Sequence, residues 1–425
     1  MEKGKLIYDR VYKSLLLLIV FISIFNRPLS HLMGINLSYL DEVLLLFSVG
    51  LFSLYILLAR KVKMVYLLVV LFFFYSICIS VLFGLNQNLI DIIFQTLVTL
   101  KFSIITLAFF LLFKNDQLLV RRFYWTLLGI LLLGVLLNIV FATDFNHFIG
   151  LKVSSRPFTK IIRYGGWINP NQLAYFMVLS VGLVLNRAYM AQRMLKKRDW
   201  TILISLIFII LLTDSRSAFL GVFLFFLFFY KNLVLRKAKI LLTVLSLSFV
   251  CIGIIVIYTD FLDTMIRNLN DSFSLESFYI RGIIINMAIQ ISYGYFPIGT
   301  GAATFGSVFS KGSQVYEDFG VADRYFFTEM AGIYDSSLAS VLGEYGILGL
   351  LLFGLIFYYF KRFLHDNNKT NKPVMTSAFL VVFLFFSFTN PTFTNNIYIF
   401  LSLPFIMGYK FIFKEDKSLQ FHKKD

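Results

Sequence analysis

The dominant pattern in this chain is a series of long apolar runs separated by short polar segments. Most runs approach the roughly 20 residues that cross a bilayer as a helix, and they are too long and too uniformly apolar for barrel strands. We predict twelve membrane-spanning helices. They cover residues 12–26, 41–59, 64–84, 92–113, 123–142, 170–186, 200–214, 216–230, 240–259, 338–360, 373–389 and 396–413.

One polar cluster, Asp214-Ser215-Arg216-Ser217, interrupts the apolar run 200–230. An arginine at the centre of a membrane helix is costly, at about 2.5–3.5 kcal/mol on insertion scales. A single helix over 200–230 would also place the later basic loops on the outer side. We therefore predict two helices with a tight turn between them, and Arg216 on the outer side.

Composition and charge support a membrane protein. The 425 residues are 59% hydrophobic and only 15% charged, against roughly 25% charged in soluble domains. Of the 39 Lys and Arg residues, 28 fall in segments that lie in the cytoplasm when the N-terminus does, 10 fall on the outer side, and Lys101 lies within a predicted span. This distribution follows the positive-inside rule, so the net charge of +16 does not indicate binding to nucleic acid. Both termini are predicted to be cytoplasmic.

The predicted fold is an all-α polytopic membrane protein, with residues 1–425 as a single transmembrane domain. Two outer loops are long, 143–169 and 260–337, and long ordered loops are usually functional. The larger loop lies between predicted helices 9 and 10 and contains a helical pattern near 276–294, which we expect to lie along the membrane surface. The four histidines show no metal-ligand spacing, so no metal site and no cofactor are expected.

Three arginines, Arg163, Arg216 and Arg281, lie on the cation-poor outer side beside helix-starting or turn-forming residues. Each alone is typical of an arginine that reaches from a helix to the membrane interface. Together they favour an anion site, because the planar guanidinium binds phosphate oxygens bidentately and stays charged. Asn171 follows Pro170 where a helix should begin, beside Arg163.

Two acidic residues flank the start of the tenth predicted span. Asp335 and Ser336 stand at its mouth, where Asp335 either caps the helix or serves as a catalytic carboxylate. Glu344 lies about 13 Å further along the helix and should either pair with another group or face a wet cavity.

The order of five short motifs resembles the O-antigen ligase and polysaccharide polymerase superfamily of bacterial membrane glycosyltransferases. The motifs are RYGGWINPNQLAY, TDSRSAFLG, FYIRGIIINMA, PIGTGAATFG and DSSLASVLGEYGILG, and they cover roughly residues 160–355. The family pattern is a His followed by Asn, Ser or Gln, nine residues and a Gly-x-x-Gly. Here the spacing fits, and Asp335 occupies the position of the histidine.

The resemblance implies a fold like that of GT-C glycosyltransferases and an active site on the outer face of the bacterial cytoplasmic membrane. It assigns diphosphate binding to Arg216 and Arg281, with Arg163 as the third arginine and Asn171 and Ser336 as further substrate contacts. Asp335 would replace the family's histidine as the base, since both groups accept a proton. The departure from histidine favours a repeat-unit polymerase over a ligase.

The implied substrate is an oligosaccharide linked to undecaprenyl diphosphate. The reaction would build a capsule, an exopolysaccharide or an O-antigen without a metal ion and with inversion at the anomeric carbon. The partners expected on this basis are membrane lipid and a chain-length regulator. Nucleic acid is not expected to bind. Two alternatives stay open: a ligase that attaches finished glycan to another acceptor, and a flippase for the lipid-linked oligosaccharide. Flippases tend to show repeated halves, and this sequence shows none.

Overall fold

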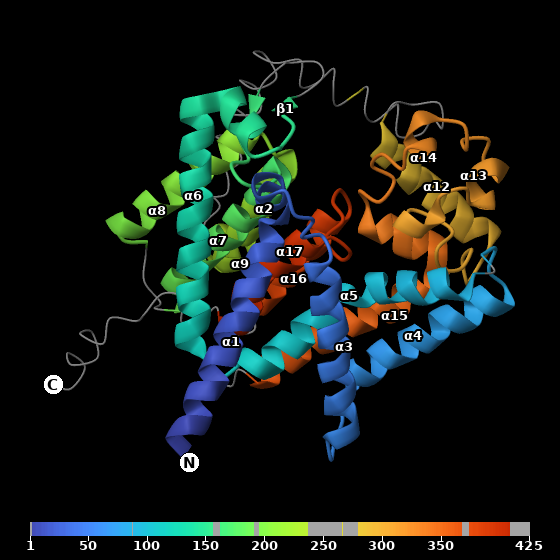
Figure 1. Cartoon of the computed structure of the whole chain (residues 1–425), viewed down its shortest axis with the longest axis horizontal. Coiled ribbons are helices and arrows are strands. Elements are labelled where there is room, and N and C mark those ends of the chain that lie inside the picture. The colour runs from blue at the N-terminus through green and yellow to red at the C-terminus, as the bar shows by residue number, and fades with distance from the viewer. Residues whose placement is uncertain are drawn as a thin grey trace. The chain divides into compact units, whose positions relative to one another are not determined.

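The computed structural model describes residues 2–86, 88–155, 162–190, 195–236, 266, 279–367 and 374–408. Over these residues the protein is almost wholly helical, with one two-stranded antiparallel sheet (Figure 1). Within them, six helices are long and apolar enough to cross a membrane, or up to seven if one bent helix pair counts as a span. The chain is therefore an all-α protein with several membrane-spanning helices.

The chain divides into two compact units, and each is described here by itself. Unit 1 comprises Met1–Tyr55, Ile104–Phe219 and Asn396–Asp425, and unit 2 comprises Ile56–Ser103 and Leu220–Asn395. The division falls inside three helices: α3 (Leu40–Leu58), α5 (Leu89–Phe113) and α9 (Arg216–Arg236).

Unit 1 is built around a deeply buried helix, α7. Its other elements are α1 (Glu2–Ile24), α2 (Asn26–Met33), α6 (Gln117–Phe148), α8 (Lys197–Thr213), α17 (Asn396–Gly408), β1 (Ser154–Ser155) and β2 (Ile162–Arg163). Helix α7 runs over Pro170–Met190 and packs against α8 and α17. It begins as predicted at Pro170, whose missing N–H costs nothing in the first turn. The Tyr175 and Ser402 hydroxyls, 2.6 Å apart, join α7 to α17.

Unit 2 contains the described part of the large outer loop, from residue 279 on, and the helices that support it. Its further elements are α4 (Met64–Leu82), α12 (Ile280–Gly294), η1 (Val308–Ser310), α13 (Gln314–Asp318), α14 (Tyr325–Thr328), α15 (Ser337–Asn367) and α16 (Val374–Ser387). Helices α4 and α15 pack side by side and run in opposite directions (Figure 1). Phe72 contacts Tyr345, and Tyr66, earlier in α4, contacts Phe363, later in α15.

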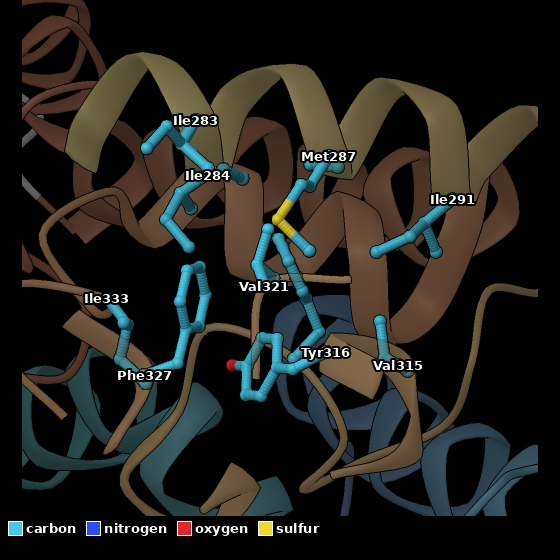
Figure 2. Packing of buried hydrophobic residues seen from close by; sticks show 12 residues of the cluster. Ile283, Ile284, Met287, Ile291, Val315, Tyr316, Val321, Phe327 and Ile333 are labelled. Atoms are coloured by element: carbon cyan, nitrogen blue, oxygen red, sulfur yellow. The ribbon is translucent and has the colours of Figure 1, made fainter. Parts of the chain in front are cut away.

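Residues 279–345, which we call the lobe, have a hydrophobic core of their own. Figure 2 shows Ile284, Met287 and Ile291 on one face of α12, directed toward Val315, Tyr316 and Phe327 of the loop that follows. These side chains are all at most 2% exposed. Burial of such apolar side chains contributes about 1.5–3 kcal/mol each, so the lobe is held together by its own packing.

Helix α15 is interrupted at Gly346, whose φ of 64° and ψ of −165° are not helical. Residues 297–306 of the lobe, which we call the Gly-rich segment, fill the interruption with backbone hydrogen bonds. Thr300 N donates to Gly343 O at 3.1 Å and Gly301 N to Glu344 O at 2.8 Å, and Leu348 N donates to Pro297 O at 3.2 Å. A side chain at position 346 would meet Pro297 O at 2.4 Å, so both conformation and space require glycine.

Eleven of the twelve predicted spans coincide with helices, and the twelfth, 240–259, lies outside the described residues. The predicted turn is confirmed, because α8 ends at Thr213 and α9 begins at Arg216. A helix also lies in the large loop, at Ile280–Gly294. The total of twelve spans, the single transmembrane domain and the GT-C likeness stay predictions.

The predicted end of one span, residue 142, coincides with a break in α6 at Ala142, where φ is 43°. Beyond this break a further helical stretch continues to Phe148, inside the predicted loop 143–169. The amides of Asn138 and Asn146 both donate to Ala142 O, at 3.1 and 3.2 Å. These side-chain bonds satisfy a carbonyl that the break would leave open, so the helix resumes.

Candidate functional site

The candidate residues form two groups, one in each unit. Unit 1 contains Arg163, Asn171 and Arg216, and unit 2 contains Arg281, Asp335 and Ser336. Within each group the structure brings together residues that lie far apart in the sequence.

In unit 1, Arg163 joins three segments of the chain. Its Nε donates to Thr213 O at 2.9 Å, and its Nη2 donates to the Asn171 side-chain oxygen at 2.6 Å. The neighbouring backbone adds a further bond, from Tyr164 N to Leu212 O at 3.0 Å. The end of α8 is thus attached to strand β2 and to the start of α7.

The turn between α8 and α9 depends on Asp214, which adopts the left-handed conformation with φ 47° and ψ 41°. Asp and Asn tolerate this conformation better than most side chains. Asp214 N donates to Leu211 O at 3.0 Å and so closes the end of α8. Arg216 is exposed and is the first residue of α9. The start of a helix carries partial positive charge, which adds to the attraction of Arg216 for an anion.

In unit 2, Arg281 and Asp335 form an ion pair across 54 positions of sequence. Arg281 Nε lies 3.1 Å and Nη2 3.0 Å from the same carboxylate oxygen, Oδ2. Both side chains are partly buried, at 29% and 28% exposed. Burial raises the pKa of the Asp335 carboxyl above its usual value, and the charge and hydrogen bond of Arg281 lower it, with a net rise. A raised pKa makes a carboxylate a stronger base.

Ser336, and not Asp335, caps α15. The Ser336 hydroxyl accepts a hydrogen bond from Ala339 N at 3.3 Å, and the Ser336 side chain is buried. The capping role considered for Asp335 is therefore wrong, because its carboxylate is directed to Arg281 instead. Ser336 fixes the start of the helix immediately after the ion pair. Its predicted contact with substrate stays a prediction.

Glu344 is fully buried and hydrogen-bonded, as its depth in the sequence suggested. Its Oε2 accepts from Gln95 Nε2 of α5 at 2.9 Å. The Ser307 side chain and the peptide groups of Ala303 and Phe305 lie near the same carboxylate. This carboxylate thus lies between α5, α15 and the Gly-rich segment.

Two members of these clusters escaped sequence reasoning. Gln95 is a polar residue inside an apolar run. This pattern indicates that its side chain needs a polar partner, which in the structure is Glu344. The carbonyl of Thr213 carries no side-chain signal, so its bond to Arg163 was not predictable. Chemically, the unit 2 pair combines an anion-binding cation with a proton acceptor, and unit 1 supplies an exposed arginine at a helix start.

Comparison with known proteins supports one family. Residues 201–354 match the family model described as O-antigen ligase. This match covers the turn with Arg216, the lobe with Arg281 and Asp335, and the break in α15. No curated protein matches the chain. Over residues 201–354 the chain is thus similar to the O-antigen ligase family, in agreement with the resemblance drawn from the sequence motifs.

Proposed function

We propose that the protein is a membrane polymerase that joins lipid-linked oligosaccharide repeat units into a cell-surface polysaccharide. The observation that carries the proposal is the Arg281–Asp335 ion pair at the start of α15. It combines a proton acceptor at the family's histidine position with a phosphate-binding cation. A capsule, an exopolysaccharide and an O-antigen are all products of this class.

The proposed donor is the growing glycan, attached through its anomeric carbon to undecaprenyl diphosphate. A hydroxyl of the incoming repeat unit attacks that carbon, and its proton passes to the Asp335 carboxylate. The bond from the anomeric carbon to the diphosphate oxygen breaks, and its electron pair stays on the lipid diphosphate. Attack opposite the leaving group inverts the anomeric carbon.

Arginine side chains would stabilise the charge that develops on the leaving diphosphate. Groups positioned in advance toward such charge are often worth 10²–10³-fold in rate, about 2.7–4 kcal/mol. We assign this role to Arg281 and Arg216, with Arg163 and Asn171 supporting the segment before Arg216. Since guanidinium groups supply the positive charge, the proposed reaction requires no metal ion.

The ion pair also suggests an order of events. A diphosphate has more negative charge than a carboxylate and offers several oxygens for bidentate bonds. When it binds Arg281, the guanidinium is shared or lost by Asp335, whose pKa then rises. The base would therefore gain strength when the donor is in place.

A ligase is the second candidate, because the matching family model is described as O-antigen ligase. A ligase would use the same donor and transfer the finished glycan to a different acceptor. The two candidates therefore differ only in the acceptor, which either is or is not another lipid-linked repeat unit.

The test uses purified protein in liposomes with one defined lipid-linked repeat unit as the sole substrate. Polymerisation predicts a ladder of longer glycans on a gel, each step one repeat unit larger. If the only product appears after a separate acceptor is added, and without a ladder, the ligase replaces the polymerase. If the repeat unit crosses the bilayer with no new glycosidic bond, both enzyme proposals fail and a flippase remains.

A further inference from the structure

Helix α15 has two stretches, because it is broken at Gly346. From Ser337 to Asp366 the helix is apolar enough to span a membrane, and the hydrocarbon core of a bilayer is about 30 Å thick. Since the two stretches do not form one straight helix, the membrane-spanning part is identified from their side chains.

The side chains of α15 indicate which part that is. Every residue from Ser336 to Gly346 is buried or only partly exposed, because the lobe surrounds this stretch. Immediately afterwards large apolar side chains become exposed, among them Ile347 at 37%, Leu348 at 42% and Leu351 at 60%. Apolar side chains open to the surroundings are expected where lipid is the solvent. The apolar part from Ile347 to Phe360 is about 21 Å long, and the charged residues Lys361 and Arg362 follow it.

The C-terminal end of α4 lies next to the segment that fills the break in α15. Leu85 N donates to Thr300 O at 3.0 Å, and Ala302 N donates to the Ser80 hydroxyl at 2.7 Å. The segment that contacts the end of α4 is thus the one that fills the break in α15. Helix α4 thus ends beside the break in α15. Leu82, the last residue of α4, is 69% exposed.

Large apolar side chains of the lobe are exposed next to this break. Phe296 is 67% exposed and precedes Pro297, whose carbonyl bonds to Leu348 N. Tyr293, in the last turn of α12, is 88% exposed. Val308 is 66% exposed, and its neighbour Phe309 stacks on Phe94 near the start of α5. Aromatic side chains of this kind are enriched at membrane–water interfaces.

The rest of the lobe surface is different in character. The exposed residues of α13, α14 and their connections include the acidic side chains Glu317, Asp318, Asp323 and Glu329. Charged side chains of this kind are expected in water. In Figure 1, α12, α13 and α14 gather at the end of α4 where that helix meets the Gly-rich segment.

We propose that the lobe stands on the bilayer, with Tyr293, Phe296 and Val308 inserted in the lipid headgroup region beside Leu348. Helix α12 then rises from the membrane with its C-terminal end in the interface, instead of lying along the surface as the sequence pattern led us to expect. Asp335 belongs to the lobe and lies before the break at Gly346. The occupant of this surface is phospholipid.

The test places a nitroxide spin label on single cysteines in full-length protein, with Cys78 and Cys251 replaced by serine, reconstituted in phospholipid bilayers. Labels are introduced through Tyr293→Cys and Phe296→Cys. The matched control is Tyr325→Cys on α14, which is 68% exposed, and the lipid reference is Leu355→Cys in α15. Collision with oxygen reports the bilayer, and collision with a water-soluble nickel chelate reports water.

The expected result is an oxygen-to-nickel ratio several-fold higher at positions 293 and 296 than at 325, and lower than at 355. A ratio at 293 and 296 equal to that at 325 would overturn the proposal. Low collision rates with both reagents would show a protein contact and would overturn it equally. Because Tyr293 is almost fully exposed, its replacement removes little packing. The measurement reads position only, so its outcome is independent of whether the enzyme activity is found.

Discussion

Arg163 and Arg281 are held by different kinds of partner. Arg163 donates to a backbone carbonyl and a side-chain amide oxygen, both neutral, and these bonds fix the backbone on either side of the turn before Arg216. Arg281 is paired with a carboxylate. A neutral partner attached to the backbone positions a segment, whereas a charged partner can be exchanged for a substrate anion. We therefore expect Arg163 to fix the backbone before Arg216, and Arg281 to take part in the proposed reaction.

The largest expected effect is on the carboxylate of unit 2. Asp335→Asn removes the proposed base but keeps the size of the side chain, and polymerisation should fall roughly 10²–10⁴-fold. Ladder formation by purified protein measures this. The control is Asp323→Asn, an exposed acid of the same lobe, which should leave the rate unchanged. Full activity of Asp335→Asn would refute the assignment of the base.

For Arg281→Ala we expect a loss of roughly 10²–10³-fold in rate, which is somewhat smaller than the loss expected for Asp335→Asn. This change also shifts the pH dependence. The base works when deprotonated, so activity falls as the pH drops through the pKa of Asp335. Arg281 lowers that pKa, and its removal should move the acidic limb of the profile to higher pH.

A pH–rate profile for Arg281→Ala and the unmodified protein checks this shift. Arg27→Ala, at an exposed arginine of α2, is the matched control and should leave both the rate and the acidic limb in place. An unchanged limb in Arg281→Ala would mean that the ion pair does not set the pKa of the base.

In unit 1 a more moderate loss is expected. Arg163→Ala detaches the end of α8 from β2 and α7, which should cost about 1.5–3 kcal/mol of stability for a hydrogen bond involving a charged group. The rate should drop about tenfold, because Arg216 loses its support rather than its charge. Arg163→Lys should behave similarly, since lysine lacks the planar fork. Thermal unfolding and ladder formation measured together separate the two effects, and full rescue by lysine would show that charge alone is needed.

The smallest effect is predicted for Asn171→Ala. It removes one acceptor of Arg163 and leaves the bond to Thr213 O in place, so stability should fall by only about 0.5–1.5 kcal/mol. The rate should change less than about threefold. A loss as large as that of Arg281→Ala would indicate direct contact of Asn171 with substrate and would remove the distinction between the two units.

The sequence was informative where the physics is local. Apolar runs near 20 residues predicted eleven of the observed helices, because a bilayer selects for that length and composition. The turn at Asp214 was predictable because a charged cluster within hydrocarbon is costly. Asp335 was identified by its position at the mouth of the tenth predicted span and, through the resemblance to the family, by its spacing to Gly346 and Gly349.

Contacts through the backbone were not predictable. Arg163 binds a carbonyl fifty positions away, and the identity of Thr213 has no influence on that bond. The break in α15 was hidden because Gly346 lies in a run whose other residues suit a helix. The ion pair of Arg281 with Asp335 requires α12 to pack on α15, and that packing depends on a core assembled from the whole lobe.

The junction between the Gly-rich segment and α15 has a consequence for how the protein tolerates change. Three of its hydrogen bonds join backbone to backbone, so an exchange of a side chain such as that of Ile298 leaves these bonding groups intact. A deletion or insertion of one residue between Pro297 and Gly301 would move these partners out of register, even if every side chain were otherwise suitable. At this place the protein constrains the number of residues and, at Gly299, Gly301 and Gly346, also their kind.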